Sequence, residues 1–168
     1  MFKSILGRLF WTYAIILMLV FTSVAVTVGI FVNHFAISTH MNNVISVSQN
    51  LEYWTGSLQI EDTDYRARAA YKQLLRSWGS FLNSDIIVTN SNGEVLESTT
   101  SSATVPDELV HIVTNGNIVK KYSTLNGSYK NKMMVIGVPI KYQGGIVGAS
   151  FYVTGIFDIR KTTLELFM

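Results

Sequence analysis

The chain has 168 residues, no cysteine, 13 Lys and Arg against 11 Asp and Glu, and a formal net charge of +2. Without cysteine it can form neither disulfides nor thiolate metal sites, and it has no Cys nucleophile. Residues 33–155 carry nine basic and nine acidic side chains, so the positive excess lies at the two ends of the chain. The charge therefore gives no indication of a nucleic-acid partner.

The first predicted element is a membrane-spanning helix at residues 9–32. No Asp, Glu, Lys or Arg occurs between Arg8 and Glu52, and residues 9–32 are almost entirely apolar. At about 1.5 Å per residue this segment extends roughly 36 Å, enough to cross a hydrocarbon core of about 30 Å. We therefore expect a lipid bilayer to be one partner of this chain.

The flanking charges predict the orientation of this helix. Lys3 and Arg8 precede it and no cation follows closely, so the positive-inside bias places residues 1–8 in the cytoplasm and residues after about 32 outside it. The alternative is a cleaved signal peptide, whose apolar region is usually about 7 to 15 residues long. The greater length found here favours an uncleaved anchor in the cell membrane.

An apolar stripe continues beyond the predicted span. Its positions follow alternating spacings of four and three: Ile37, Met41, Val44, Ser48, Leu51, Thr55 and Leu58. This pattern predicts that the helix leaves the bilayer without a break. The stripe can form a homodimer together with the membrane helix, or it can pack on its own domain, and the pattern is the same in both cases.

A second helix is predicted to begin after a cap at Asp62 or Thr63. Its apolar positions repeat with helical spacing: Tyr71, Leu74, Leu75, Trp78, Phe81 and Leu82. Its basic residues lie mostly around the other side, which we interpret as a solvent-exposed face: Arg66, Arg68, Lys72 and Arg76. The acidic residues before it (Glu61, Asp62 and Asp64) favour a helix N-terminus rather than a metal site.

After residue 84 the pattern changes to a β-hairpin followed by a short helix. Residues 85–89 and 94–98 are rich in β-forming side chains and flank an Asn-Gly turn. Residues 107–114 fit a helix with proline and acidic residues at its start. His111 lies within this helix, and we expect it to pack rather than to catalyse.

The remaining chain predicts three further strands, at residues 118–125, 133–142 and 146–154. The middle one is apolar on both faces and is therefore expected inside the sheet. The predicted fold class is α+β: an N-terminal transmembrane helix continuing into a long helix, then a five-stranded antiparallel sheet with flanking helices.

Two segments carry a resemblance to a known family. Residues 137–140 (GVPI) followed by residues 144–149 (GGIVGA) resemble the closing hairpin of Cache domains, the PAS-like sensor modules of bacterial histidine kinases and chemoreceptors. Residues 85–97 resemble the opening hairpin of the same family. The resemblance implies an extracytoplasmic domain at residues 33–155, with residues 156–168 as a helix leading toward a second transmembrane segment.

The resemblance also implies a ligand between the sheet and its overlying loops, here residues 98–105 and 122–132. Lys120, Tyr122, Tyr129 and Lys130 bring cationic and aromatic groups to this region that suit a carboxylate or another small anion. The alternative is that these residues form an exposed strand and loop. An envelope protein is a further possible partner.

The predicted function is the signal-input portion of a bacterial sensor histidine kinase of a two-component system, acting through the membrane helices of a dimer. The alternatives are the input domain of a chemoreceptor or cyclase, and a stand-alone single-pass membrane protein that binds a partner. The sequence contains no P-loop, G-x-S-x-G or H-E-x-x-H motif. We therefore expect no enzyme and no cofactor in this segment.

Overall fold

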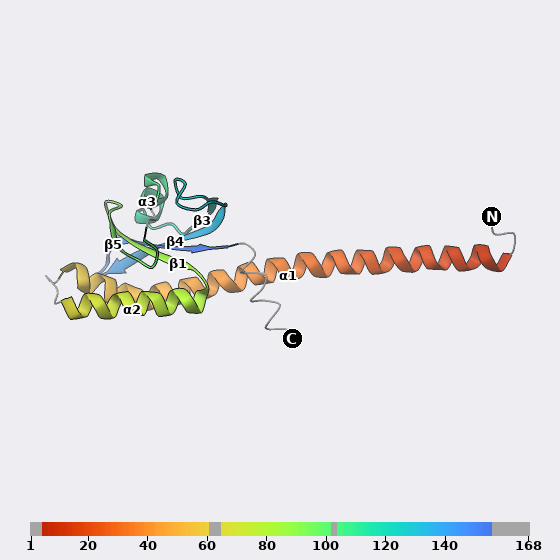
Figure 1. The fold of residues 1–168 in the computed structure, drawn as a ribbon, viewed down its shortest axis with the longest axis horizontal. Helices are drawn as coiled ribbons and strands as arrows, with labels where there is room; N and C mark the ends of the chain where they lie inside the picture. The colour runs from red at the N-terminus through yellow and green to blue at the C-terminus, as the bar shows by residue number, and fades with distance from the viewer. Residues whose placement is uncertain (1–4, 61–64, 102–103, 156–168) are drawn as a thin grey trace. The chain divides into compact units, whose positions relative to one another are not determined.

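The computed structural model describes residues 5–60, 65–101 and 104–155 (Figure 1). Its elements, in chain order, are α1 Ile5–Ile60, α2 Tyr65–Leu82, β1 Asp85–Asn90, β2 Val95–Ser98, α3 Asp107–Thr114, β3 Val119–Ser123, β4 Met133–Tyr142 and β5 Gly145–Thr154. The predicted α+β fold class is confirmed. The predicted cap at Asp62 or Thr63, the acidic cluster beside it and the helix at residues 156–168 lie outside the described residues.

The chain divides into two units, residues 1–38 and residues 39–168. In the first unit, α1 exposes large apolar side chains along most of the predicted span, among them Phe10, Leu19 and Phe31. The stretch of α1 from Gly7 to Thr55 includes a segment of mean hydropathy 2.7, long and apolar enough to cross a membrane. The helix is therefore able to serve as the predicted anchor, while its orientation stays a prediction.

The second unit is built on the sheet, whose strand order is β2-β1-β5-β4-β3. All neighbouring strands run antiparallel. The central strand is β5, which pairs with β1 from Asp85↔Val153 to Asn90↔Gly148 and with β4 on its other side. The strand predicted to be interior, β4, is interior, and the edges are β2 and β3.

The apolar core under α3 occupies one face of the sheet. Side chains alternate between the two faces along a strand, so one parity of each strand contributes to this core. Its members are Ile87, Val105, Leu109, Val110, Val113, Leu125, Val135, Ala149, Phe151 and Val153. Because Leu109, Val110 and Val113 follow helical spacing, the eight residues of α3 present one apolar face to the sheet.

The opposite face of the sheet is covered by α2 and by the part of α1 in this unit (Figure 1). Val44, Ser48, Leu51 and Thr55 of the predicted stripe are at most 2% exposed, and Thr55 Oγ1 lies 2.6 Å from the Tyr71 hydroxyl of α2. These four residues therefore pack on their own domain rather than on a second copy. A homodimer through α1 stays a prediction that has to use other faces of the helix.

Two side chains differ from their predicted positions. Phe81 of α2 is 69% exposed and stacks edge-on against Trp78, with 5.9 Å between ring centroids. His111 of α3 is exposed, and its Nδ1 lies 3.1 Å from Asn115 Nδ2. Helical spacing predicts which residues share the apolar face of a helix. It does not show which of these residues are covered by the rest of the domain.

Candidate ligand-binding site

Two adjoining hollows lie at the end of the sheet where β1 begins and β5 ends, and both are lined by Arg76 and Thr99. The first has a volume of about 380 Å³, and Ser84, Asp85 and Val153 also line it. Gly79 of α2 borders this hollow and has no room for a larger side chain, since a Cβ there would lie 2.9 Å from the Ser84 carbonyl oxygen. This close approach of α2 to the start of β1 brings Arg76 and Asp85 to the lining of one hollow.

The second hollow has a volume of about 650 Å³ and lies between α2 and the segment that follows β2. Its lining is rich in hydroxyl groups from Ser98, Thr99, Thr100, Ser101 and Thr104. Lys72 and Glu97 also line it and form an ion pair of 2.9 Å. Their side chains are 46% and 23% exposed, so the pair adds only about 0–1 kcal/mol to stability.

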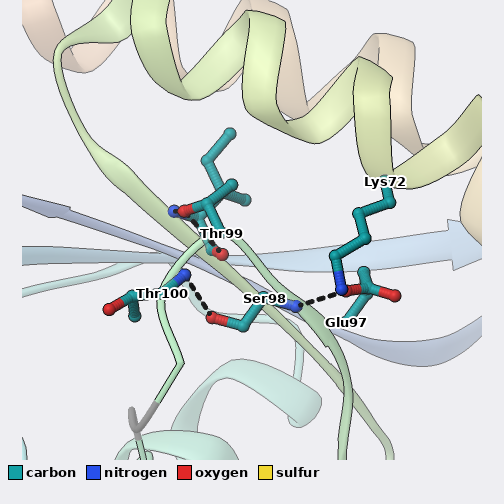
Figure 2. A network of polar contacts seen from close by, with 6 residues as sticks. Lys72, Glu97, Ser98, Thr99 and Thr100 are labelled. Carbon is teal, nitrogen blue, oxygen red and sulfur yellow. Dashed lines mark hydrogen bonds and ion pairs between the residues drawn. The ribbon is translucent and has the colours of Figure 1, made fainter.

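Hydrogen bonds fix the segment after β2 against β1 (Figure 2). The Thr99 amide donates to the Ile86 carbonyl at 2.9 Å, and the Ile86 amide donates to Thr99 Oγ1 at 2.8 Å. The Thr100 amide donates to Ser98 Oγ at 3.1 Å. Thr99 is therefore held rigidly at the point where the two hollows meet.

The first hollow presents one positive and one negative side chain. Among the described residues Arg76 makes no ion pair, so its guanidinium is available to an anion. Asp85 Oδ2 accepts a hydrogen bond of 2.7 Å from the Tyr129 hydroxyl. Burial and the neighbouring Asp85 raise the pKa of Tyr129, which keeps this phenol protonated as a donor. Within the part of the chain that the structure describes, no second donor reaches the Asp85 carboxylate, which has further acceptor positions for a donor from a ligand.

The structure does not gather the four predicted ligand residues into one site. Lys120 and Tyr122 are exposed on the edge strand β3, opposite Ile136 and Met134. Lys121 between them contacts Glu108 of α3 at 3.1 Å, so Lys120 and Tyr122 point to the other face of the sheet. Lys130 is exposed, and neither hollow is lined by any of these lysines.

Of the four, Tyr129 alone reaches the site, through its hydrogen bond to Asp85. Its ring packs against the core under α3, which fixes the direction of the hydroxyl. The site predicted from sequence did not include Arg76, Asp85 or Thr99. A signal was present at Arg76, because the residues three and four positions later are Gly79 and Ser80, which are small enough to leave space beside the guanidinium.

Comparison with known proteins gives a result at the level of fold. No protein-family model matches the sequence, and no curated protein matches it. Among solved structures, the chain is similar to the ligand-binding domain of the Campylobacter jejuni chemoreceptor Tlp3 in complex with L-norvaline, with a TM-score of 0.53 and 14% identity. That match covers 76% of this chain and 59% of the Tlp3 domain.

Two further similar structures are the sensor domain of the V. cholerae histidine kinase DctB and the ligand-binding domain of the Pseudomonas aeruginosa amino acid chemoreceptor PctC with GABA. Their TM-scores are both 0.47, at 8% and 11% identity. The matches cover 77% and 76% of this chain, and 57% and 62% of those domains. The chain thus spans about three fifths of each of these domains. The similarity of its fold to the Tlp3 ligand-binding domain agrees with the Cache-like, PAS-like fold that the sequence resemblance predicted.

Proposed function

We propose that this chain is the signal-input portion of a transmembrane receptor, in which the sheet domain binds a small molecule and α1 connects it to the membrane. The observation that carries this proposal is the first hollow, where Asp85 and Arg76, which makes no ion pair among the described residues, line one space of about 380 Å³. This volume lies within the range of small-molecule sites, about 300–1,000 Å³. Ligand binding would shift the population between two packings of the domain on its helices.

The charges of the hollow define the ligand class. A guanidinium binds a carboxylate through two parallel hydrogen bonds, and a carboxylate such as Asp85 binds an ammonium group. A ligand that carries both groups, an α-amino acid, satisfies both side chains at once. The solved Tlp3 ligand-binding domain is in complex with an amino acid, L-norvaline. The proposed ligand still carries the carboxylate predicted from sequence, but we propose that Arg76 binds it instead of Lys120 and Lys130.

A ligand panel tests this proposal on the full chain in lipid nanodiscs. We expect calorimetric titration to detect binding of one or more L-α-amino acids. The corresponding amines without the carboxylate, and the N-acetyl amino acids without the ammonium group, are expected to bind at least about tenfold more weakly, because each lacks the group that pairs with one of the two charges of the hollow. Equal binding of all three forms, or binding of none of the amino acids, would contradict the proposal.

For the output of the receptor we propose a histidine kinase of a two-component system, as the topology predicted from sequence suggests. Chemoreceptor and cyclase outputs share the same input topology, and a stand-alone membrane protein is the remaining alternative. The reading frame downstream of codon 168 decides among them. We expect about 20 apolar codons followed by a cytoplasmic region with a phosphoacceptor histidine. A methyl-accepting helical bundle, a cyclase or a stop codon there would each exclude the kinase.

A further inference from the structure

The second hollow contains hydroxyl donors that have no acceptor. Ser98, Ser101 and Thr104 line it, and among the described residues none of their hydroxyl protons is donated to another group. Thr99 is different, because its Oγ1 accepts from the Ile86 amide and lies 3.4 Å from the Ile86 carbonyl oxygen. The residues after β2 therefore offer hydroxyl protons to a ligand in this hollow.

Two cations of α2 line the same hollow. Lys72 and Arg76 are four residues apart, so they are neighbours on one side of the helix. An ammonium group has three N–H donors, and Lys72 uses one of them on Glu97 Oε1 at 2.9 Å (Figure 2). Arg76 makes no ion pair among the described residues. The helix therefore adds further donors and two positive charges to the hollow.

Among the described residues that line this hollow, Glu97 alone is acidic. Its Oε1 contacts Lys72 and lies 3.4 Å from the Ser98 amide, whereas its Oε2 accepts no hydrogen bond from the described part of the chain. Two cations and one carboxylate give the hollow a net charge of +1. It therefore suits an anion that accepts several hydrogen bonds and donates one.

We propose that the second hollow binds inorganic phosphate. The oxygens of this anion accept hydrogen bonds from guanidinium, ammonium and hydroxyl groups. At neutral pH inorganic phosphate also keeps at least one proton, which it can donate to Glu97 Oε2. Sulfate has the same shape but no proton, and a phosphate monoester has largely lost its last proton, because its second pKa is about 6. Glu97 is therefore the residue that selects inorganic phosphate.

This inference does not rest on the proposed amino-acid site. Arg76 lines both hollows, but Lys72, Glu97 and Ser98 line the second one alone. The volume of about 650 Å³ exceeds that of one phosphate ion, so we expect water to fill the rest and to bridge hydroxyl groups that the ion does not reach. Because both cations are exposed, added salt should weaken binding.

Calorimetric titration of the full chain in uncharged maltoside micelles, in a phosphate-free buffer at neutral pH, tests the proposal. We expect sodium phosphate to bind at least about fivefold more tightly than sodium sulfate or methyl phosphate at the same ionic strength, because it alone presents a donor to Glu97. Equal binding of phosphate and sulfate, or no binding of phosphate, would overturn the proposal. Tighter binding of methyl phosphate would assign the hollow to a phosphate monoester and would overturn the choice of inorganic phosphate.

Three variants make this test specific. Lys72→Gln should weaken phosphate binding at least about fivefold, whereas Arg68→Gln, which removes the same charge from α2 outside both hollows, should change it less than about twofold. Glu97→Gln should bind sulfate at least as tightly as phosphate, because the new amide can donate to either anion. The exposed pair of Lys72 and Glu97 adds little to stability, so these variants should fold, and thermal melts check this. Equal weakening by Lys72→Gln and Arg68→Gln, or an unchanged preference for phosphate in Glu97→Gln, would contradict the proposal.

Discussion

Replacement of Gly148 by alanine is expected to lower the free energy of unfolding by about 3 kcal/mol or more. A Cβ at this position would lie 2.1 Å from the Thr89 carbonyl oxygen and 3.2 Å from the Thr89 carbonyl carbon. Both are backbone atoms of β1, so no side-chain rotation relieves the contact. The central strand β5 would have to move away from β1, breaking the register in which Asn90 faces Gly148.

The matched control lies in the same strand. At Gly145 the nearest heavy atom to a new Cβ is the Tyr142 carbonyl oxygen at 3.9 Å, an ordinary contact. Gly145→Ala should therefore change the unfolding free energy by no more than about 0.5 kcal/mol. Urea denaturation of both variants in detergent micelles, followed by tryptophan fluorescence, compares them directly. If the two variants are equally stable, the observed pairing of β1 with β5 is wrong.

The fold was largely predictable because each element carries its own local signal. The Asn-Gly turn ends β1, and Gly93 in this turn has a φ of 89°, which glycine adopts without strain. The order of strands in the sheet was not predictable in the same way. Both β4 and β5 are apolar on both faces, and only the pairing of β5 with β1 makes β5 the central strand. Likewise, the stripe on α1 could not reveal from sequence alone whether it packs on its own domain.

The site was less predictable, because its residues come together only through tertiary packing. Arg76 comes from α2, Asp85 begins β1 and Thr99 follows β2. The sequence reading grouped Lys120 and Tyr122 with Tyr129 because they are close in sequence. In a strand, however, Lys121 and its two neighbours point to opposite faces, and the contact of Lys121 with Glu108 of α3 fixes which face is which. Only the observed contact of Lys121 with α3 shows that Lys120 and Tyr122 point to the other face of the sheet from the core against which Tyr129 packs.

Substitution of Arg76 by glutamine is expected to weaken binding of the amino acid by about 10- to 100-fold, which corresponds to the loss of a charge-assisted hydrogen-bonding pair. Arg76→Lys should recover only part of this loss, because an ammonium group is a point charge and cannot form the two parallel hydrogen bonds of a guanidinium. Calorimetric titration of the full chain in nanodiscs measures both effects. The same variants should leave the weak binding of the decarboxylated amine unchanged, since that ligand has no carboxylate.

Arg68→Gln is the matched control for this prediction. Arg68 is exposed on the same helix and lines neither hollow, so its loss removes the same charge from α2 without altering the site. Asp85→Asn should show the reverse selectivity of Arg76→Gln. It should weaken binding of the amino acid but leave binding of the N-acetyl form unchanged, because that form has no ammonium group to pair with Asp85. If Arg68→Gln and Arg76→Gln weaken binding equally, the effect is long-range attraction by the charge of α2, and Arg76 does not contact the carboxylate. Opposite selectivity of the Arg76 and Asp85 variants would place the two ends of the ligand on these two side chains.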